Sequence, residues 1–173
     1  MSANADKELE PYQPFFLSGI LISTLGVLIW FLFQIGWLKF YPQEAHAYLM
    51  IGGFLLAYIS GFLMTAIPRM TGTNSASVIE ISTGLAFLWA QVAFVLRNQM
   101  TMAKISVLLL LINLVSYLIR RFLRRSSLPP KAFVFIPIGI ISAIVGLGIQ
   151  IANEYVAGVP ASLLEWSKLA IYQ

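Results

Sequence analysis

Apolar residues in this chain fall into five long blocks separated by short polar segments. Each block approaches the roughly 20 apolar residues that a helix needs to cross the hydrocarbon of a bilayer. Each is expected to be an α-helix, because hydrocarbon offers no partner to an unpaired backbone amide. The predicted spans cover residues 15–38, 45–67, 78–96, 103–119 and 132–152, and residues 162–173 predict an amphipathic helix or part of a sixth span. The pattern therefore predicts an all-α, polytopic membrane helix bundle.

Composition supports the same class of protein. Of the 173 residues, 59% are hydrophobic and 10% are charged, whereas soluble domains carry about 25% charged residues. No repeat or low-complexity linker divides the chain, which predicts a single membrane domain over residues 1–173. The first apolar block is too long for a cleavable signal and follows an acidic segment. The sequence contains no cysteine, which excludes disulfides and thiolate metal sites.

The basic residues predict an orientation of the chain in the membrane. Lys and Arg favour the cytoplasmic side of short loops. Seven lie on the side of the N-terminus and four on the opposite side, with the cluster "RRFLRR" at residues 120–125 dominating the count. This bias places the N-terminus in the cytoplasm. It also explains the net charge of +4 without a nucleic-acid partner.

Local motifs mark where two helices begin and end. The stretch "SVIE" predicts a capping box, in which Ser77 caps the third span and Glu80 reaches back to it. Pro68 is expected to close the second span. Glu44, His46, Asn153 and Glu154 all fall near the outer ends of spans, which suggests that they converge on one polar site.

The second span carries the only histidine of the chain and a stripe of small residues. At 100° per residue, His46, Met50, Gly53 and Ala57 share one helix face, and Gly61 lies only slightly off it. One interpretation is close packing of another helix, which small residues at this spacing permit. The other is a flat strip for a planar macrocycle, with His46 or a methionine as axial ligand of haem iron. The spacing alone favours helix packing.

Two segments carry a family resemblance. "PYQPFFLSG" at residues 11–19 and "HAYLMIGGFLLAYISGFLMTAIPRMTG" at residues 46–72 resemble the NnrS family of bacterial membrane proteins. That family has been linked to nitric oxide and denitrification metabolism and reported to carry haem and copper. The resemblance implies a haem-associated protein in which His46 stands at the first histidine of the family motif. These positions agree in register with it: Met50, Gly53, Gly61, Phe62, Thr65, Ala66, Pro68, Thr71 and Gly72.

The chain departs from the family pattern at several positions, among them Arg69 and Met70, which replace an Asn-Trp pair. Tyr48 and Leu49 stand where the family has a second histidine and a glutamate, and Gln13 replaces an arginine. Of the implied ligands only His46 remains, which makes haem the more strongly expected cofactor and copper the less expected one. Binding of no cofactor stays open as an alternative. Family members are typically longer, so this chain would be a short or truncated relative.

Two functional hypotheses remain. The first is a haem-binding protein linked to nitric oxide or redox metabolism, with His46 as metal ligand. The second is a non-catalytic membrane scaffold or assembly subunit that has lost the cofactor site. The sequence shows no nucleophile with its base and no phosphate-binding loop, so no self-sufficient enzyme is expected. The expected partners are the lipid bilayer and other membrane subunits or a second copy of the chain.

Overall fold

The computed structural model describes residues 10–128, 130–156 and 159–172, and this part of the chain contains helices and no strands. The helices, in chain order, are α1 (Tyr12–Gln34), α2 (Gln43–Ala47), η1 (Tyr48–Leu55), α3 (Leu56–Thr71), α4 (Val78–Leu96), α5 (Met100–Leu123), η2 (Lys131–Val134), α6 (Phe135–Tyr155) and α7 (Ala161–Tyr172). Because α2, η1 and α3 form one continuous helix, the described residues contain five helices long and apolar enough to cross a membrane. The predicted all-α membrane bundle is confirmed.

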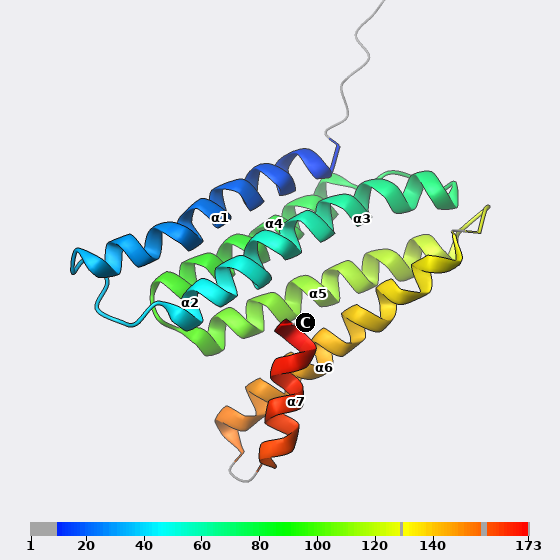
Figure 1. Cartoon of the computed structure of the whole chain (residues 1–173). Coiled ribbons are helices and arrows are strands. Elements are labelled where there is room, and N and C mark those ends of the chain that lie inside the picture. The colour runs from blue at the N-terminus through cyan, green and yellow to red at the C-terminus, as the bar shows by residue number, and fades with distance from the viewer. Residues whose placement is uncertain (1–9, 129, 157–158, 173) are drawn as a thin grey trace, which may run out of the picture.

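The long helices run alongside one another (Figure 1). Helix α1 packs against η1 and α3, α4 packs against α5, and α6 lies against α5 on one side and α7 on the other. One end of the bundle holds α2 and is called here the His46 end. The other holds the end of α5 and is called the Arg121 end. Large side chains such as Phe15, Leu88 and Tyr117 are fully buried between the helices.

The outward faces of the helices are also apolar. Side chains such as Leu17, Val27, Phe31 and Ile119 are more than half exposed. A helix that is apolar on all sides is typical of a membrane span. The faces that no neighbouring helix covers therefore suit a lipid environment.

The second span is not a regular α-helix over its whole length. Residues Tyr48–Leu55 form a π-helix, with eight residues of wider winding between α2 and α3. π-Helical segments are rare and are often found at functional sites. The buried side chain of Gln91 on α4 donates its Nε2 hydrogen to the Tyr48 carbonyl at 2.8 Å. An amide from another helix thus satisfies a backbone acceptor of the π-helix.

The end of the second span differs from the prediction. Pro68 lies inside α3, and the helix ends at Thr71 with Gly72 in the left-handed conformation at φ +65°. Proline has no N–H to donate to the carbonyl four residues earlier, which is that of Met64. The buried hydroxyl of Tyr117 on α5 donates to this carbonyl at 2.9 Å. The helix continues past Pro68 because a neighbouring helix supplies the missing donor.

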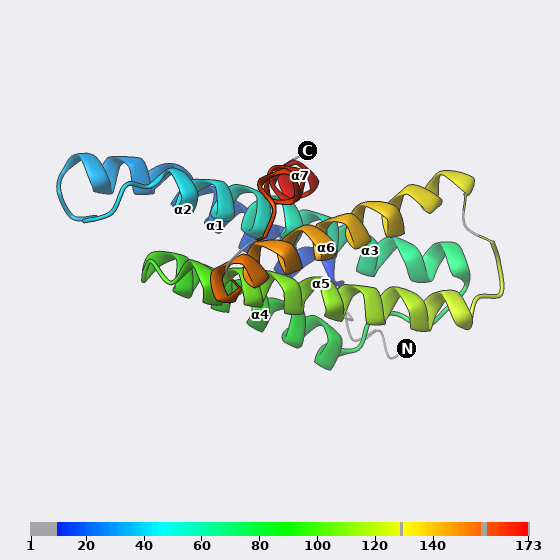
Figure 2. The ribbon, with the colours of Figure 1, turned by 90° about the horizontal axis from the view of Figure 1, so that it is seen from below.

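Helix α7 runs beside α6, which it follows along the chain (Figures 1 and 2). It has 12 residues, and at about 1.5 Å per residue it is shorter than the hydrocarbon of a bilayer. The segment predicted as an amphipathic helix or part of a sixth span is therefore a short helix that packs on α6.

Candidate functional site

The single histidine is oriented by the first span. The Nδ1 atom of His46 lies 2.8 Å from the backbone carbonyl oxygen of Gly26 on α1. A carbonyl oxygen can only accept, so in the neutral ring Nδ1 carries the proton and Nε2 keeps its lone pair. The Trp30 ring packs edge-on against the half-buried imidazole, with 5.9 Å between ring centroids. Histidines that bind metals commonly donate their other ring N–H in this way, because the hydrogen bond fixes the tautomer and orients the ring.

The small-residue stripe of the second span faces α1. A Cβ atom built on Gly53 would lie 2.5 Å from Cγ2 of Ile22, and one on Gly61 would lie 2.9 Å from Cβ of Phe15. Ala57 is fully buried. The thioether of Met50 packs against Gly26, where a built Cβ would lie 3.0 Å from its Sδ. These contacts are those of close helix packing, and side chains of α1 fill the strip.

The five residues named from the sequence thus lie on one face, but they differ in what they present. Gly53, Ala57 and Gly61 provide a surface for α1, and this packing leaves no room there for a planar macrocycle. His46 alone keeps a ring nitrogen with a lone pair. A haem bound by His46 would therefore lie beyond the strip.

A charged cluster ties three helices together at the His46 end. Nζ of Lys104 on α5 lies 2.5 Å from Oε1 of Glu154 on α6 and 3.8 Å from Oε1 of Glu44 on α2. The Thr101 hydroxyl also donates to Glu154. Two of the residues expected to converge, Glu44 and Glu154, therefore meet at one ammonium group. The ring of His46 instead contacts α1.

A second charged cluster lies at the Arg121 end. Glu80 and Ser77 form the capping box at the start of α4, so this prediction is confirmed. The same carboxylate pairs with Arg121 at 3.0 Å and with Arg120 at 2.9 Å. Arg121 also donates to the carbonyls of Asn74 and Ser75. Its role in joining α5 to the loop before α4 was missed, because the sequence presents it only as one of several basic residues near a membrane surface.

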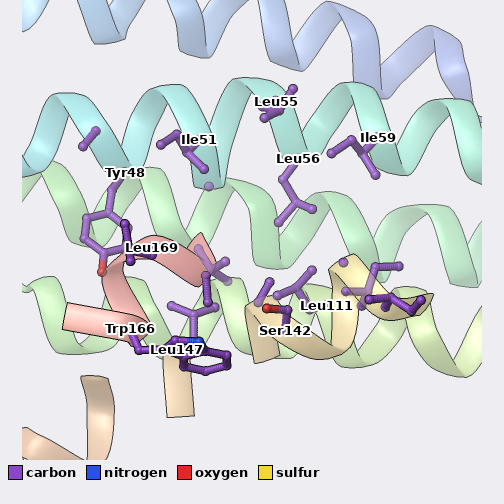
Figure 3. A pocket seen from close by; sticks show the side chains of 18 residues that line it. Tyr48, Ile51, Leu55, Leu56, Ile59, Leu111, Ser142, Leu147, Trp166 and Leu169 are labelled. Carbon is purple, nitrogen blue, oxygen red and sulfur yellow. The ribbon is translucent and has the colours of Figure 1, made fainter. Parts of the chain in front are cut away.

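An apolar cavity opens between the second span, α5, α6 and α7 (Figure 3). Its volume is about 610 Å³. The residues that line it are Ala47, Tyr48, Ile51, Gly52, Leu55, Leu56, Ile59, Val107, Leu111, Ile138, Gly139, Ile140, Ser142, Ala143, Leu147, Trp166, Leu169 and Ala170. Sequence reasoning missed this cavity, since it depends on how α6 and α7 pack against the other helices.

Tyr48 and Leu49, which stand where the family motif has a histidine and a glutamate, occupy different surroundings. Tyr48 lines the cavity and donates its hydroxyl to Oε1 of Gln150 at 2.9 Å. Leu49 is fully buried in the core. Within the described part of the chain, no three His, Asp or Glu side chains gather closely enough to hold a metal ion between them.

Comparison with known proteins identifies the family. No curated protein and no solved structure matches the chain. A family model described as "NnrS protein" matches residues 9–172. The match extends well beyond the two segments that carry the resemblance in the sequence. It includes His46, the small-residue stripe of the second span and all five long helices. The chain belongs to the NnrS family.

Proposed function

We propose that this protein is a haem-associated member of the NnrS family that acts in nitric oxide-linked or redox metabolism, with His46 as the axial ligand. The observation that carries the proposal is the 2.8 Å hydrogen bond between Nδ1 of His46 and the Gly26 carbonyl. That bond fixes the ring tautomer that leaves Nε2 free to coordinate iron. When bound, haem iron supplies a centre that changes oxidation state and binds small gaseous ligands.

The residues fit haem through the imidazole and not through the small-residue strip. Helix α1 fills the strip, and Met50 uses its thioether to pack against Gly26. The chain has one histidine. A second histidine ligand would therefore come from another membrane subunit or a second copy of the chain, which would give an oligomeric partner a chemical role.

The proposed setting is a bacterial inner membrane with the N-terminus in the cytoplasm. The excess of Lys and Arg on the N-terminal side of the bundle, seven against four, supports it. The His46 end would then face the periplasm. Reporter fusions that are active only on one side of the membrane, placed in the loops at residues 35–42 and 72–77, test this orientation.

The proposal is tested by the absorption spectrum and pyridine haemochrome of the detergent-purified protein, with analysis for iron and copper. The informative variants are His46→Ala and His46→Gln, because a glutamine amide keeps a donor for the Gly26 carbonyl but offers no ligand nitrogen. The matched control is Glu44→Gln, two residues away at the same end of the bundle.

The expected result is a Soret band in the wild type and in Glu44→Gln that is lost in both His46 variants. Circular dichroism should show unchanged helix content in His46→Gln. A wild-type protein that folds and is colourless after expression with ample haem would overturn the proposal. The function would then be that of a membrane scaffold or assembly subunit.

A further inference from the structure

The apolar cavity lies between helices long and apolar enough to cross a membrane. Its lining residues on the second span, α5 and α6 are all inside the segments long and apolar enough to cross a membrane. Its volume of about 610 Å³ falls within the roughly 300–1,000 Å³ of typical ligand pockets. Among the described residues that line it, side-chain polar atoms come from Tyr48, Ser142 and Trp166. Water gains few partners in such a space, so an apolar occupant is favoured.

The cavity has one polar end. Tyr48 lines it at the His46 end, and its hydroxyl donates to Oε1 of Gln150 at 2.9 Å. The same amide carries the donor Nε2 next to Oε1; Gln150 adjoins the cavity through Tyr48 and is not itself a lining residue. The opposite end of the cavity, towards Ile138 and Gly139, is apolar. This polarity matches a molecule with a hydrocarbon chain and one polar head.

The charges beyond the polar end select the type of head. Lys104 lies one helical turn from the cavity residue Val107, and Glu154 lies one turn from Gln150. Lys104 is paired with both Glu154 and Glu44. One ammonium and two carboxylates sum to a charge of −1, so this cluster would repel an anionic head. Both carboxylates already pair with Lys104, so the cluster offers no unpaired carboxylate to a cationic head. An uncharged head with a hydrogen-bond acceptor suits these groups.

We propose that this cavity binds the hydrocarbon chain of a membrane amphiphile with an uncharged, carbonyl-bearing head at the His46 end. Trp166 and Leu169 of α7 line one side of this cavity (Figure 3). Two sources share this chemistry, an uncharged ester lipid and a long-chain quinone. The site is separate from the His46 ring, whose contacts are with α1.

Tryptophan fluorescence provides a direct test, since Trp166 is one of four tryptophans and the one that lines the cavity. Replacing Trp30, Trp37 and Trp89 with phenylalanine isolates its signal. Two probes with the same quenching chain are titrated in detergent, the glycerol monoester of 9,10-dibromostearic acid and the free acid at pH 8. The expected result is saturable quenching by the ester, with one ester molecule bound per protein molecule, and several-fold weaker binding of the acid. Glu44→Gln removes one negative charge and should reduce the difference in affinity between the ester and the acid.

Two substitutions on α6 test whether the ester's hydrocarbon tail binds in the cavity. Ala143→Phe fills the cavity and should abolish saturable quenching, while Val145→Phe adds the same ring to an exposed position and should leave it unchanged. Ser142→Leu is the second cavity-filling variant should Ala143→Phe fail to fold. Displacement of the ester by decyl-ubiquinone would identify a long-chain quinone as the ligand. Failure of decyl-ubiquinone to displace the ester would identify an ester lipid as the ligand. Quenching that rises without saturation, or that persists in folded cavity-filling variants, would overturn the proposal.

Discussion

Pro68 leaves the Met64 carbonyl without its helical donor, and the hydroxyl of Tyr117 donates to it instead. The contribution of this hydrogen bond to stability can be predicted quantitatively. Tyr117→Phe removes the hydroxyl that donates to the Met64 carbonyl at 2.9 Å, without changing the packing of a fully buried ring. The carbonyl is then buried without a donor, because residue 68 is proline. Leaving a buried acceptor unsatisfied costs about 1–3 kcal/mol in proteins generally. Interhelical hydrogen bonds in membranes measure about 0.6–2 kcal/mol, so we expect a loss of about 1–2 kcal/mol.

The reasoning depends on the proline, which permits a double-mutant cycle. In Pro68→Ala the new N–H of residue 68 is placed to donate to the Met64 carbonyl as in an ordinary helix. Tyr117→Phe should then cost little, and the coupling free energy between the two substitutions should be about 1 kcal/mol or more. Tyr58→Phe is the control, since the Tyr58 ring is held by stacking on Phe16 at 4.4 Å between centroids.

The free energy of unfolding of the four proteins in the cycle can be measured by reversible denaturation in mixed micelles, followed by circular dichroism. Each variant needs its own full transition, so that the slopes can be compared. An equal cost of Tyr117→Phe in the wild-type and Pro68→Ala backgrounds would refute the reasoning. It would mean that the tyrosine hydroxyl does not compensate for the missing backbone donor.

Three further predictions use the same unfolding measurement. Gly53→Ala should destabilise the protein by about 1–3 kcal/mol, because the added Cβ meets Ile22 at 2.5 Å. The control is Gly148→Ala, where an added Cβ meets nothing within 4 Å. Equal stability of the two variants would contradict the packing of α1 on the small-residue stripe. Arg121→Lys should lower the free energy of unfolding by about 1–3 kcal/mol. Lysine keeps the charge but not the forked donors that reach Glu80 and the carbonyls of Asn74 and Ser75. An unchanged unfolding transition would show that charge alone holds the loop before α4. Ser77→Ala should cost about 1 kcal/mol through loss of the helix cap, and Ser82→Ala, later in the same helix, should cost less.

The sequence predicted those features that depend on local chemistry or on the thickness of a bilayer. The five long helices follow from apolar length, because hydrocarbon imposes both the length and the helical state of a span. The capping box at Ser77 was predicted because its two partners are three residues apart. The continuation of the second helix beyond residue 67 was not predicted, because the compensating hydroxyl of Tyr117 lies 53 residues from Met64 in the sequence.

The candidate sites were predicted less completely because they depend on contacts between helices. Helical periodicity identified the face shared by His46 and Gly53, but it could not show that Ile22 of α1 covers that face. Glu154 and Glu44 were expected at one end, yet the lysine that joins them, Lys104, was counted only for orientation. The cavity required the positions of α6 and α7, for which the sequence carries no local signal.

The most direct test of the proposed role is a haem titration of protein purified without haem, followed by the Soret absorption. Wild type and His46→Gln are compared at equal chain concentration. The proposal requires a saturable Soret shift in the wild type, with an end point of at most one haem per chain, and no saturable shift in His46→Gln. Identical titrations of the two proteins would contradict the assignment of His46 as the axial ligand.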